Sequence, residues 1–321
     1  MREMAYYEAK LEALSEIMTD ERVHLMGGTF FALSPRRVLF QKLAEKYPGR
    51  VLFTPISELA FCGLAIGAAM AGLRPVVDLV TGSFIYEAWP QVVNEAANAY
   101  YMSGGQTRAP VVFHVLHGLR GSGAAQHSQS PQAMLWNAPG LEIVIPSSPR
   151  DFKGLLKSAV NSPNPTIFVD HVQLFEVRGQ VPDEEIIPFG QADIKRKGSD
   201  VTVVATSVEV QRSLAAAEKL AREGIEVEVF DPRTLVPFDM RALLGSIEKT
   251  GRVVIVDQCH KSCGVAAEIA ARIAEEGFDK LKAPIRRVVT PDVPVPFSPP
   301  LEEFITPTES RICDAVRSMV R

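Results

Sequence analysis

Short runs of β-branched residues alternate along the chain with segments of helical periodicity, and this alternation constrains the fold more than any other feature. In the first half, strands are expected at 23–26, 51–54, 75–80, 110–116, 141–146 and 166–170, and helices near 5–19, 36–46, 59–72, 84–101 and 149–161. Strands that are apolar almost throughout are typical of a parallel sheet covered by helices on both faces.

The alternation breaks once, at 172–198, which is mixed and charged and contains several Pro and Gly residues. Beyond it, strands are expected at 201–205, 225–230, 253–257 and 285–289, and helices near 208–223, 238–249, 264–277 and 308–319. A length of 321 residues also suits two domains. The sequence therefore predicts an α/β protein with two parallel-sheet domains, at 1–175 and 199–321, joined by a linker at 176–198.

Charge and composition exclude several classes of protein. There are 34 Lys and Arg against 38 Asp and Glu, a net charge of −4, without the basic excess of a nucleic-acid-binding protein. The longest uncharged apolar run, 59–73, has 15 residues, fewer than the roughly 20 of a membrane-spanning helix. Four cysteines do not make a disulfide framework and no secretory signal is evident, so a cytoplasmic location is expected.

The first candidate site is the segment 54–58, where a strand is expected to end and a helix to begin. Ligands of open parallel sheets bind at the carboxyl ends of strands. Two interpretations of Glu58 remain open. In one, a hydroxyl caps the helix and Glu58 only complements the helix dipole. In the other, burial among the apolar neighbours Ile56, Leu59, Phe61 and Leu64 raises its pKa and suits it to proton transfer.

The helix expected at 59–72 is apolar on every side, so it should be buried all round. Gly63, Gly67 and Ala71 recur every four residues and form a smooth stripe that lets another helix approach closely. Packing within one chain and packing between subunits both account for this stripe.

The second candidate site is the Gly-rich segment 118–130, which follows the expected strand 110–116 and contains His127. Neighbouring amide and hydroxyl groups could fix the tautomer of this imidazole. A solvated histidine on a mobile surface loop is the alternative. The segment matches neither a Walker-type loop nor GxGxxG, so it is not interpreted as a nucleotide phosphate loop.

The other histidines and cysteines indicate packing rather than chemistry. His24, His114 and His171 lie in or beside expected strands, as satisfied core residues do, whereas His117 lies nearer the Gly-rich segment and is a weak site candidate. The Cys-His-Lys-Ser-Cys segment at 259–263 lacks the spacing and further ligands of a zinc site, so buried thiols are expected there.

Several motifs together resemble the beta subunits of thiamine-diphosphate-dependent 2-oxo acid dehydrogenases, which include the pyruvate, branched-chain 2-oxo acid and acetoin enzymes. The motifs are TPISE (54–58), YYMSGG (100–105), GAAQHSQS (123–130), PG (139–140) and DVPVPFSPP (292–300). The resemblance implies a pyrimidine-binding thiamine diphosphate domain followed by a transketolase C-terminal-like domain.

The resemblance also implies partners. Such enzymes work as α2β2 heterotetramers with active sites between α and β chains, and they pass an acyl group to a lipoyl-bearing acyltransferase. This chain contains no GDG motif, with which thiamine enzymes bind Mg-diphosphate, so an alpha subunit is expected to hold Mg²⁺ and supply the other half of the thiamine diphosphate site. The chain should be an enzyme subunit that is active only with alpha and that also self-associates.

The resemblance also implies roles for individual residues of these motifs. Glu58 matches the catalytic glutamate that hydrogen-bonds the pyrimidine ring nitrogen, and Ile56 and Phe84 match cofactor-binding positions near that ring. His127 matches a catalytic loop histidine that meets the substrate carboxylate or the lipoyl thiol. A structural potassium site is matched by Val111, Ala159, Val160, Ser162 and Asn164, with Ser162 in place of the usual Asp.

Departures from the family pattern leave the substrate open. The usual acidic residues and glycine-rich loop are missing at Gly28, and Pro90, Gln132 and Asn137 stand where Asp, Glu and His are usual. Two alternatives are therefore kept: half of a split transketolase-like enzyme acting on a sugar phosphate, and a non-catalytic scaffold. Retention of Glu58 argues against the scaffold.

Overall fold

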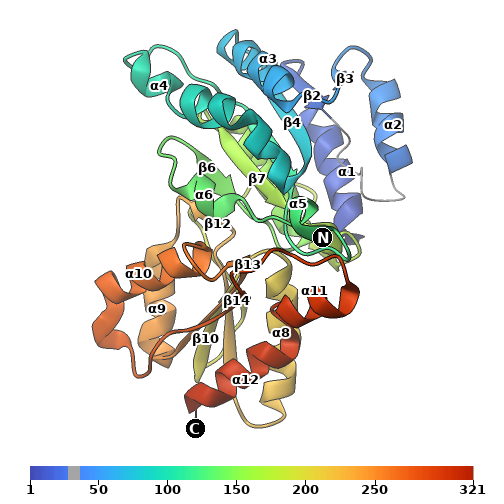
Figure 1. Ribbon diagram of the computed structural model, residues 1–321. Coiled ribbons are helices and arrows are strands. Elements are labelled where there is room, and N and C mark those ends of the chain that lie inside the picture. The colour runs from blue at the N-terminus through green and yellow to red at the C-terminus, as the bar shows by residue number, and fades with distance from the viewer. Residues whose placement is uncertain (28–36, 321) are drawn as a thin grey trace. The chain divides into compact units, whose positions relative to one another are not determined.

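The computed structural model describes residues 1–27 and 37–320, which divide into two compact units (Figure 1). The first unit comprises Met1–His117 and Met134–Phe189, and the second comprises Gly118–Ala133 and Gly190–Arg321. Each unit contains a largely parallel sheet with helices packed against it, which confirms the predicted α/β class. The segment 118–133, which lies between two strands of the first unit in sequence, belongs to the second unit.

In the first unit, parallel strands lie in the order β6-β7-β5-β4-β2-β3. Their bounds are β2 Val23–Gly27, β3 Val51–Phe53, β4 Arg74–Thr81, β5 Val112–Leu116, β6 Glu142–Val144 and β7 Thr166–Asp170. The strands β5 and β7 are buried at every position. Burial on both faces explains why apolar residues dominate their sequences.

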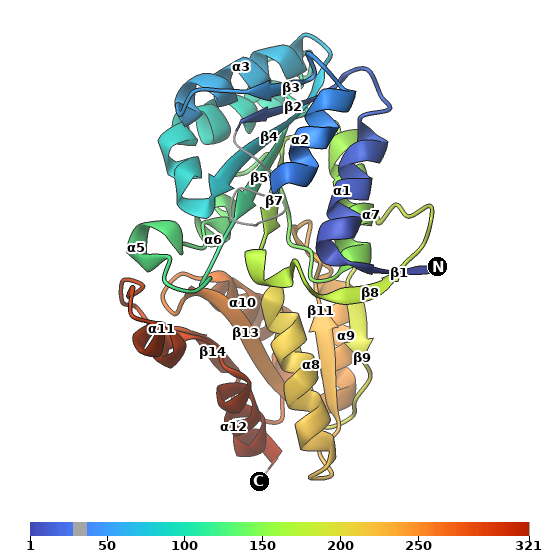
Figure 2. The same cartoon turned by 90° about the vertical axis from the view of Figure 1, so that its right-hand side faces the viewer.

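Helices of the first unit begin at local sequence signals. Helices α1 (Tyr6–Ile17) and α7 (Pro149–Asn161) pack against each other (Figure 2). Ser148 Oγ caps α7 by accepting a hydrogen bond from the Asp151 amide at 3.2 Å, and Pro149 occupies its first turn. Further elements are β1 (Arg2–Ala5), α2 (Arg37–Lys46), α3 (Glu58–Met70), α4 (Ala99–Met102), η3 (Val172–Leu174) and β8 (Arg178–Val181), while α6 (Gln132–Trp136) crosses the unit boundary.

Two stretches differ from the expected elements. The helix expected near 84–101 is divided into η1 (Gly82–Ala88), η2 (Pro90–Ala96) and α4, because Pro90 lacks the amide hydrogen that would continue a helix. The expected linker 176–198 contains β8, which pairs antiparallel with β1, and β9 (Asp193–Arg196), an edge strand of the second sheet. Both strands are short, and the alternation pattern does not predict them.

The prediction that the helix at 59–72 is buried all round is wrong for this chain. Helix α3 packs on β4, η1 and η2, and its buried residues are Phe61, Cys62, Ala65, Ile66 and Ala69. Leu59, Leu64 and Met70 are exposed. Apolar composition does not distinguish a helix buried in its own chain from one that leaves a face for a partner. Within the described ranges, no helix has the length and apolarity that crossing a membrane requires.

The second unit has the strand order β14-β13-β10-β11-β9, parallel except for the antiparallel edge strand β9. The strands are β10 Val201–Ala205, β11 Val227–Asp231, β13 Val253–His260 and β14 Arg286–Thr290, with a short β12 at Thr234–Val236. The helices are α5 Ala124–His127, α8 Val208–Ala221, α9 Met240–Thr250, α10 Val265–Gly277, η4 Phe278–Lys280, α11 Pro299–Ile305 and α12 Glu309–Val320.

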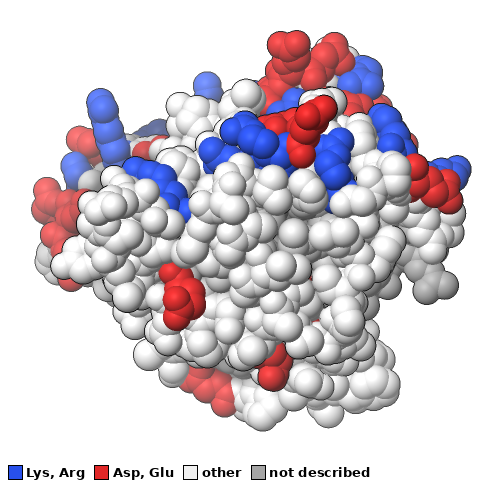
Figure 3. Space-filling model, turned by 90° about the horizontal axis from the view of Figure 1, so that it is seen from above, with Lys and Arg blue, Asp and Glu red and all other residues white. Residues whose placement is uncertain are grey.

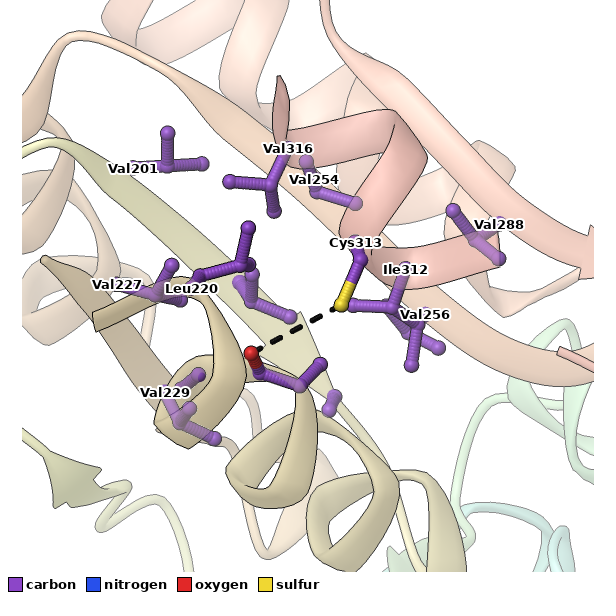
Figure 4. Packing of buried hydrophobic residues seen from close by; sticks show 14 of the residues in the cluster. Val201, Leu220, Val227, Val229, Val254, Val256, Val288, Ile312, Cys313 and Val316 are labelled. Carbon is purple, nitrogen blue, oxygen red and sulfur yellow. Dashed lines mark hydrogen bonds between the residues drawn. The ribbon is translucent and has the colours of Figure 1, made fainter. Parts of the chain in front are cut away.

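The core of the second unit lies between its sheet and the helices α8 and α12 (Figure 4). Valines from β10, β11 and β13, among them Val201, Val227 and Val254, meet Leu220 of α8 and Val316 of α12. All are at most 1% exposed. Strands with β-branched side chains and helices with one apolar face make this packing predictable from the sequence.

Candidate cofactor site and histidine loop

Glu58 is the first residue of α3 and follows closely on β3. Its side chain is half-buried, and no other residue in the described ranges forms a hydrogen bond with its carboxylate. The hydroxyl of Ser57 does not cap the helix. One turn further, burial together with the charge of Glu58 raises the pKa of the Cys62 thiol to about 12. The carboxylate is thus held at a strand-to-helix junction, with its hydrogen-bonding capacity unused by the described residues.

The apolar neighbours of Glu58 are mostly uncovered. Ile56 is 95% exposed, Leu59 52% and Leu64 59%, whereas Phe61 is 6% exposed. The expectation that these side chains bury the carboxyl group is therefore wrong for the single chain. Burying a side chain of this size stabilises by about 1.5–3 kcal/mol. Burial of these exposed side chains by a partner surface or an apolar ring would therefore be energetically favourable.

Phe84 lies half-buried in η1, which contacts both α3 and β4. The end of β4 that leads into η1 is irregular, because its pairing with β5 shifts between Asp78 and Thr81. Val80 has a φ of +61°, a left-handed backbone that β-branched residues rarely adopt. Asp78 Oδ1 accepts a hydrogen bond from the Val80 amide at 3.1 Å, and this bond stabilises the bulge from which η1 and Phe84 continue.

Asp78 belongs to a chain of buried polar groups in the core of the first unit. Its Oδ1 lies 2.9 Å from His114 Nδ1, and His114 Nε2 lies 3.1 Å from Asp170 Oδ2. Lys10 Nζ and the Tyr6 hydroxyl each donate a hydrogen bond to Asp170, both at 2.7 Å. Burial alone raises the pKa of Asp170, but the Lys10 charge and His114 outweigh it and hold that pKa below its usual range. His114 is a satisfied core residue, as expected, although its charged partners were not foreseen.

His117, the weak site candidate, follows β5 and is buried against His171, with 5.1 Å between the ring centroids. Burial lowers the pKa of His117 to about 4, although the charge of Asp170 opposes the shift. His171 Nδ1 accepts a hydrogen bond from the Gln173 amide at 3.1 Å. A buried neutral imidazole suits packing better than exchange of protons with a ligand.

His127 ends α5, a short helical turn in the second unit, and its side chain is exposed. The loop around it is held by long-range hydrogen bonds. The Leu119 amide donates to Gln258 Oε1 at 2.7 Å, and the Cys259 thiol donates to the Ser130 carbonyl at 3.7 Å. The local sequence gives no sign of these partners, which lie 139 and 129 residues away in the chain.

Glu302, on α11, binds two successive amides of the same loop. Its Oε1 accepts a hydrogen bond from Gly121 at 2.7 Å, and its Oε2 accepts one from Ser122 at 2.6 Å. The same segments share a small buried apolar cluster formed by Leu119, Val295 and Ile305. The residues just before the GAAQHSQS motif therefore contact the DVPVPFSPP motif and the helix that follows it, within the second unit.

The Cys-His-Lys-Ser-Cys segment helps to hold the DVPVPFSPP segment. Asp292 accepts hydrogen bonds from the Ser262 amide at 2.9 Å and the Ser262 hydroxyl at 2.6 Å. Cys259 is buried, but Cys263 is exposed, so the expectation of buried thiols is wrong for Cys263. Throughout residues 1–27 and 37–320, no group of three or more His, Cys, Asp or Glu side chains is placed to hold a metal ion.

The residues matched to a potassium site lie at the end of α7, in the segment that follows it, and just before β5; they are Val111, Ala159, Val160, Ser162 and Asn164. Arg74 Nη1 lies 2.5 Å from the carbonyl oxygen of Ser162 and 3.4 Å from that of Val160. The side chains of Ser162 and Asn164 donate to Glu142 at 2.6 and 3.0 Å. The Arg74 guanidinium already donates hydrogen bonds to two of these carbonyl groups. This donor set therefore fits a potassium ion only in part.

The positions that depart from the family pattern differ in environment. Gly28 lies outside the described residues. Pro90 begins η2 and is exposed, and Asn137 is exposed. Gln132 begins α6 and is fully buried directly after the His127 loop, so it is the departure that most directly affects packing beside that loop.

Known protein families and a solved structure match the fold of both units. Residues 2–177 match the family described as Transketolase, pyrimidine binding domain, and residues 190–312 match Transketolase, C-terminal domain. A solved split-gene transketolase, an inactive beta4 tetramer, superposes with a TM-score of 0.81 over 99% of this chain and 98% of that chain, at 22% sequence identity. The chain is thus a transketolase-like pair of domains.

The sequence relatives are more specific. The chain is 42% identical to pyruvate dehydrogenase E1 component subunit beta of Rickettsia felis, over 97% of each chain. It is 44% identical to acetoin:2,6-dichlorophenolindophenol oxidoreductase subunit beta of Bacillus subtilis, over 82% of this chain and 77% of that one. The chain belongs to the family of beta subunits of thiamine-diphosphate-dependent 2-oxo acid dehydrogenases. The split-transketolase alternative is not favoured, because that likeness shows the fold alone.

Proposed function

We propose that the chain is the beta subunit of a 2-oxo acid or acetoin dehydrogenase component that passes an acyl group to a lipoyl-bearing acyltransferase. Activity requires an alpha subunit in an α2β2 assembly, and alpha holds Mg²⁺ and the diphosphate of the cofactor. The proposal assigns 1–175 to a pyrimidine-binding domain, 176–198 to a linker and 199–321 to a C-terminal domain, and the matched ranges 2–177 and 190–312 support it. The cysteine content supports a reducing cytoplasm as its location.

The observation that carries this proposal is the environment of Glu58. Its carboxylate has no hydrogen-bond partner among the described residues, and Ile56, Leu59 and Leu64, which lie near it in sequence, are exposed. These groups fit a pyrimidine ring, because the carboxyl group can hydrogen-bond a ring nitrogen while Ile56 and Phe84 cover the ring. When bound, thiamine diphosphate supplies the electron sink for cleavage beside the substrate carbonyl. Glu58 would share a proton with the ring nitrogen of the bound cofactor, and its place at a strand-to-helix junction would provide the fixed distance that this requires.

His127 has a different task in this proposal. Its exposed imidazole meets groups that arrive and leave, namely the substrate carboxylate or the lipoyl thiol. The hydrogen bonds that anchor the loop to Gln258 and Glu302 support this role, because they restrict the positions that the imidazole can occupy.

The exposed face of α3 supports self-association of the beta chain. Leu59, Leu64 and Met70 are exposed on this helix, and a Cβ added at Gly67 meets no atom within 4 Å. Figure 3 shows that the charged side chains of one face gather along one side and leave a broad area with few of them. Exposed apolar patches of this kind mark protein interfaces.

A structural potassium ion near Ser162 stays a prediction, with Arg74 as its competitor for two carbonyl groups. Thermal unfolding in KCl and in NaCl at equal ionic strength tests it. A rise in Tm that is specific to potassium supports the ion, and equal Tm values in the two salts count against it.

The function is tested with the complex rather than the lone chain. Coexpression with candidate alpha subunits identifies the partner, and the purified complex is assayed for thiamine-diphosphate-dependent reduction of 2,6-dichlorophenolindophenol. Pyruvate, branched-chain 2-oxo acids and acetoin are the test substrates, and a sugar phosphate is the comparison. Turnover with a test substrate supports the proposal. Turnover with the sugar phosphate alone, or none in a stable complex, contradicts it.

A further inference from the structure

One buried carboxylate fixes the loop that carries His127. Glu302 is 5% exposed, and its two oxygen atoms accept hydrogen bonds from the successive amides of Gly121 and Ser122. Successive amides that converge on one anion form a nest, and hydrogen bonds to a charged acceptor are stronger than neutral ones. Glu302 is therefore an internal ligand of this loop.

The backbone that Glu302 holds is one that the loop does not adopt easily. Ser122 and Ala124 both have a φ of +57°, in the left-handed region that residues other than glycine disfavour. Gly121 has a φ of +87°. Removing the carboxylate takes away the interaction that stabilises this conformation, so residues 121 and 122 should relax toward other backbone states.

A change in the backbone at residues 121 and 122 would displace His127. Helix α5 begins at Ala124, two residues after Ser122, and ends at His127. The intervening Gly123 is closely packed, because a Cβ there would lie 2.4 Å from Ser128 Oγ, on the residue after His127. A shift at 121–122 therefore moves the turn, and the imidazole moves with it.

We propose that Glu302 is a positioning residue for His127, orienting the imidazole without touching the substrate. The catalytic consequence rests on the proposed function, whereas the contact between Glu302 and the loop does not. Glu303, the next residue, is exposed and carries the same charge, so Glu303→Gln is a matched control.

A double-mutant cycle in the reconstituted α2β2 complex tests the positioning role. Acyl transfer to a lipoyl domain is measured for wild type, Glu302→Gln, His127→Ala and the double variant. Glu302→Gln should lower kcat at least about tenfold when His127 is present, but less than about twofold in the His127→Ala background. Glu303→Gln should leave transfer unchanged. Equal losses in both backgrounds, or no loss in either, would overturn the proposal.

Amide exchange in the lone chain tests the contact independently of catalysis. Exchange at residues 121 and 122 should be at least about tenfold faster in Glu302→Gln than in wild type or Glu303→Gln. Unchanged exchange refutes the contact, even if the wild-type complex proves inactive and the proposed function fails. Should Glu302→Gln not fold, Glu302→Asp, which keeps the charge but shortens its reach, goes through the same cycle and the same exchange measurement.

Discussion

Replacing Lys10 with Met should destabilise the first unit by about 3–5 kcal/mol, the usual effect of leaving a buried charge without its partner. Lys10 Nζ lies 2.7 Å from Asp170 Oδ2, and neither side chain is exposed. Met keeps most of the aliphatic stem, so the loss is electrostatic rather than a cavity. Asp170 retains its hydrogen bonds with Tyr6 and His114, which favours the lower half of the range.

The effect should depend on pH in a defined direction. The pKa of Asp170 is held below its ordinary value, so the pair stabilises the fold fully above the unfolded pKa of about 4. This stabilisation fades as the pH falls further and the carboxylate is protonated. The difference between wild type and Lys10→Met should therefore be largest near neutral pH and shrink in acid.

Urea unfolding followed by tryptophan fluorescence measures the effect. Both tryptophans, Trp89 and Trp136, lie in the first unit, so their signal reports that unit alone. With an m value of roughly 2 kcal/mol per M, the midpoint at pH 7 should fall by about 1.5–2.5 M. Adding Asp170→Asn removes the unpaired charge and should recover about half of the loss.

The matched control is Lys157→Met. Its ion pair with Glu16 lies in the same unit but is partly exposed, at 17% and 33%, so the midpoint should move by at most about 0.5 M. A midpoint for Lys10→Met that stays within about 0.5 M of wild type, or an equal loss in the control, would refute the reasoning.

Three further results are expected. The lone chain should bind thiamine diphosphate and Mg²⁺ more weakly than micromolar in isothermal titration, because it has no GDG motif, and tight binding without alpha would contradict a shared site. Gly67→Leu should not destabilise the lone chain, since a Cβ there meets nothing within 4 Å and Leu has a higher helix propensity than Gly. It should weaken self-association in sedimentation by about 1–3 kcal/mol. Undiminished association rules out α3 as the interface. Burial raises the pKa of Glu209 to about 7, so the contribution of this group to stability should fall as pH rises from about 4.5 to 7. Glu209→Gln should remove on the order of 2–3 kcal/mol of that fall in urea unfolding at pH 5 and 8, followed by circular dichroism because Glu209 lies in the second unit. Parallel pH profiles of the variant and wild type count against this assignment.

Much of the architecture follows from local sequence, because a strand buried on both faces must be apolar along its length. The strand expected at 201–205 is β10, Val201–Ala205, and the strand expected at 110–116 is β5, Val112–Leu116. The helix expected near 84–101 failed where Pro90 interrupts it. The exposure of Leu64 on α3 could not be foreseen, since an apolar helix looks alike whether its own chain or another chain covers it.

The candidate site was predictable only where a motif lies at the end of a strand. Glu58 was identified in this way, but the exposure of its neighbour Ile56 was not. Glu302 was missed because the sequence around it does not indicate that this glutamate is buried. Its amide partners lie 181 and 180 residues earlier in the chain. Lys10 was missed for the same reason, since Asp170 lies 160 residues away.

The most direct test of the account is the turnover of Glu58→Gln in the reconstituted complex, measured together with its thermal unfolding. Gln keeps the shape of the side chain but cannot share an acid proton with the pyrimidine nitrogen, so turnover should fall by about 10²–10⁴ while Tm stays at the wild-type value. Glu87→Gln, at an exposed position of η1, is the control and should keep full activity. Near-native turnover of Glu58→Gln would contradict the account and leave Glu58 as an acidic residue that only complements the start of α3.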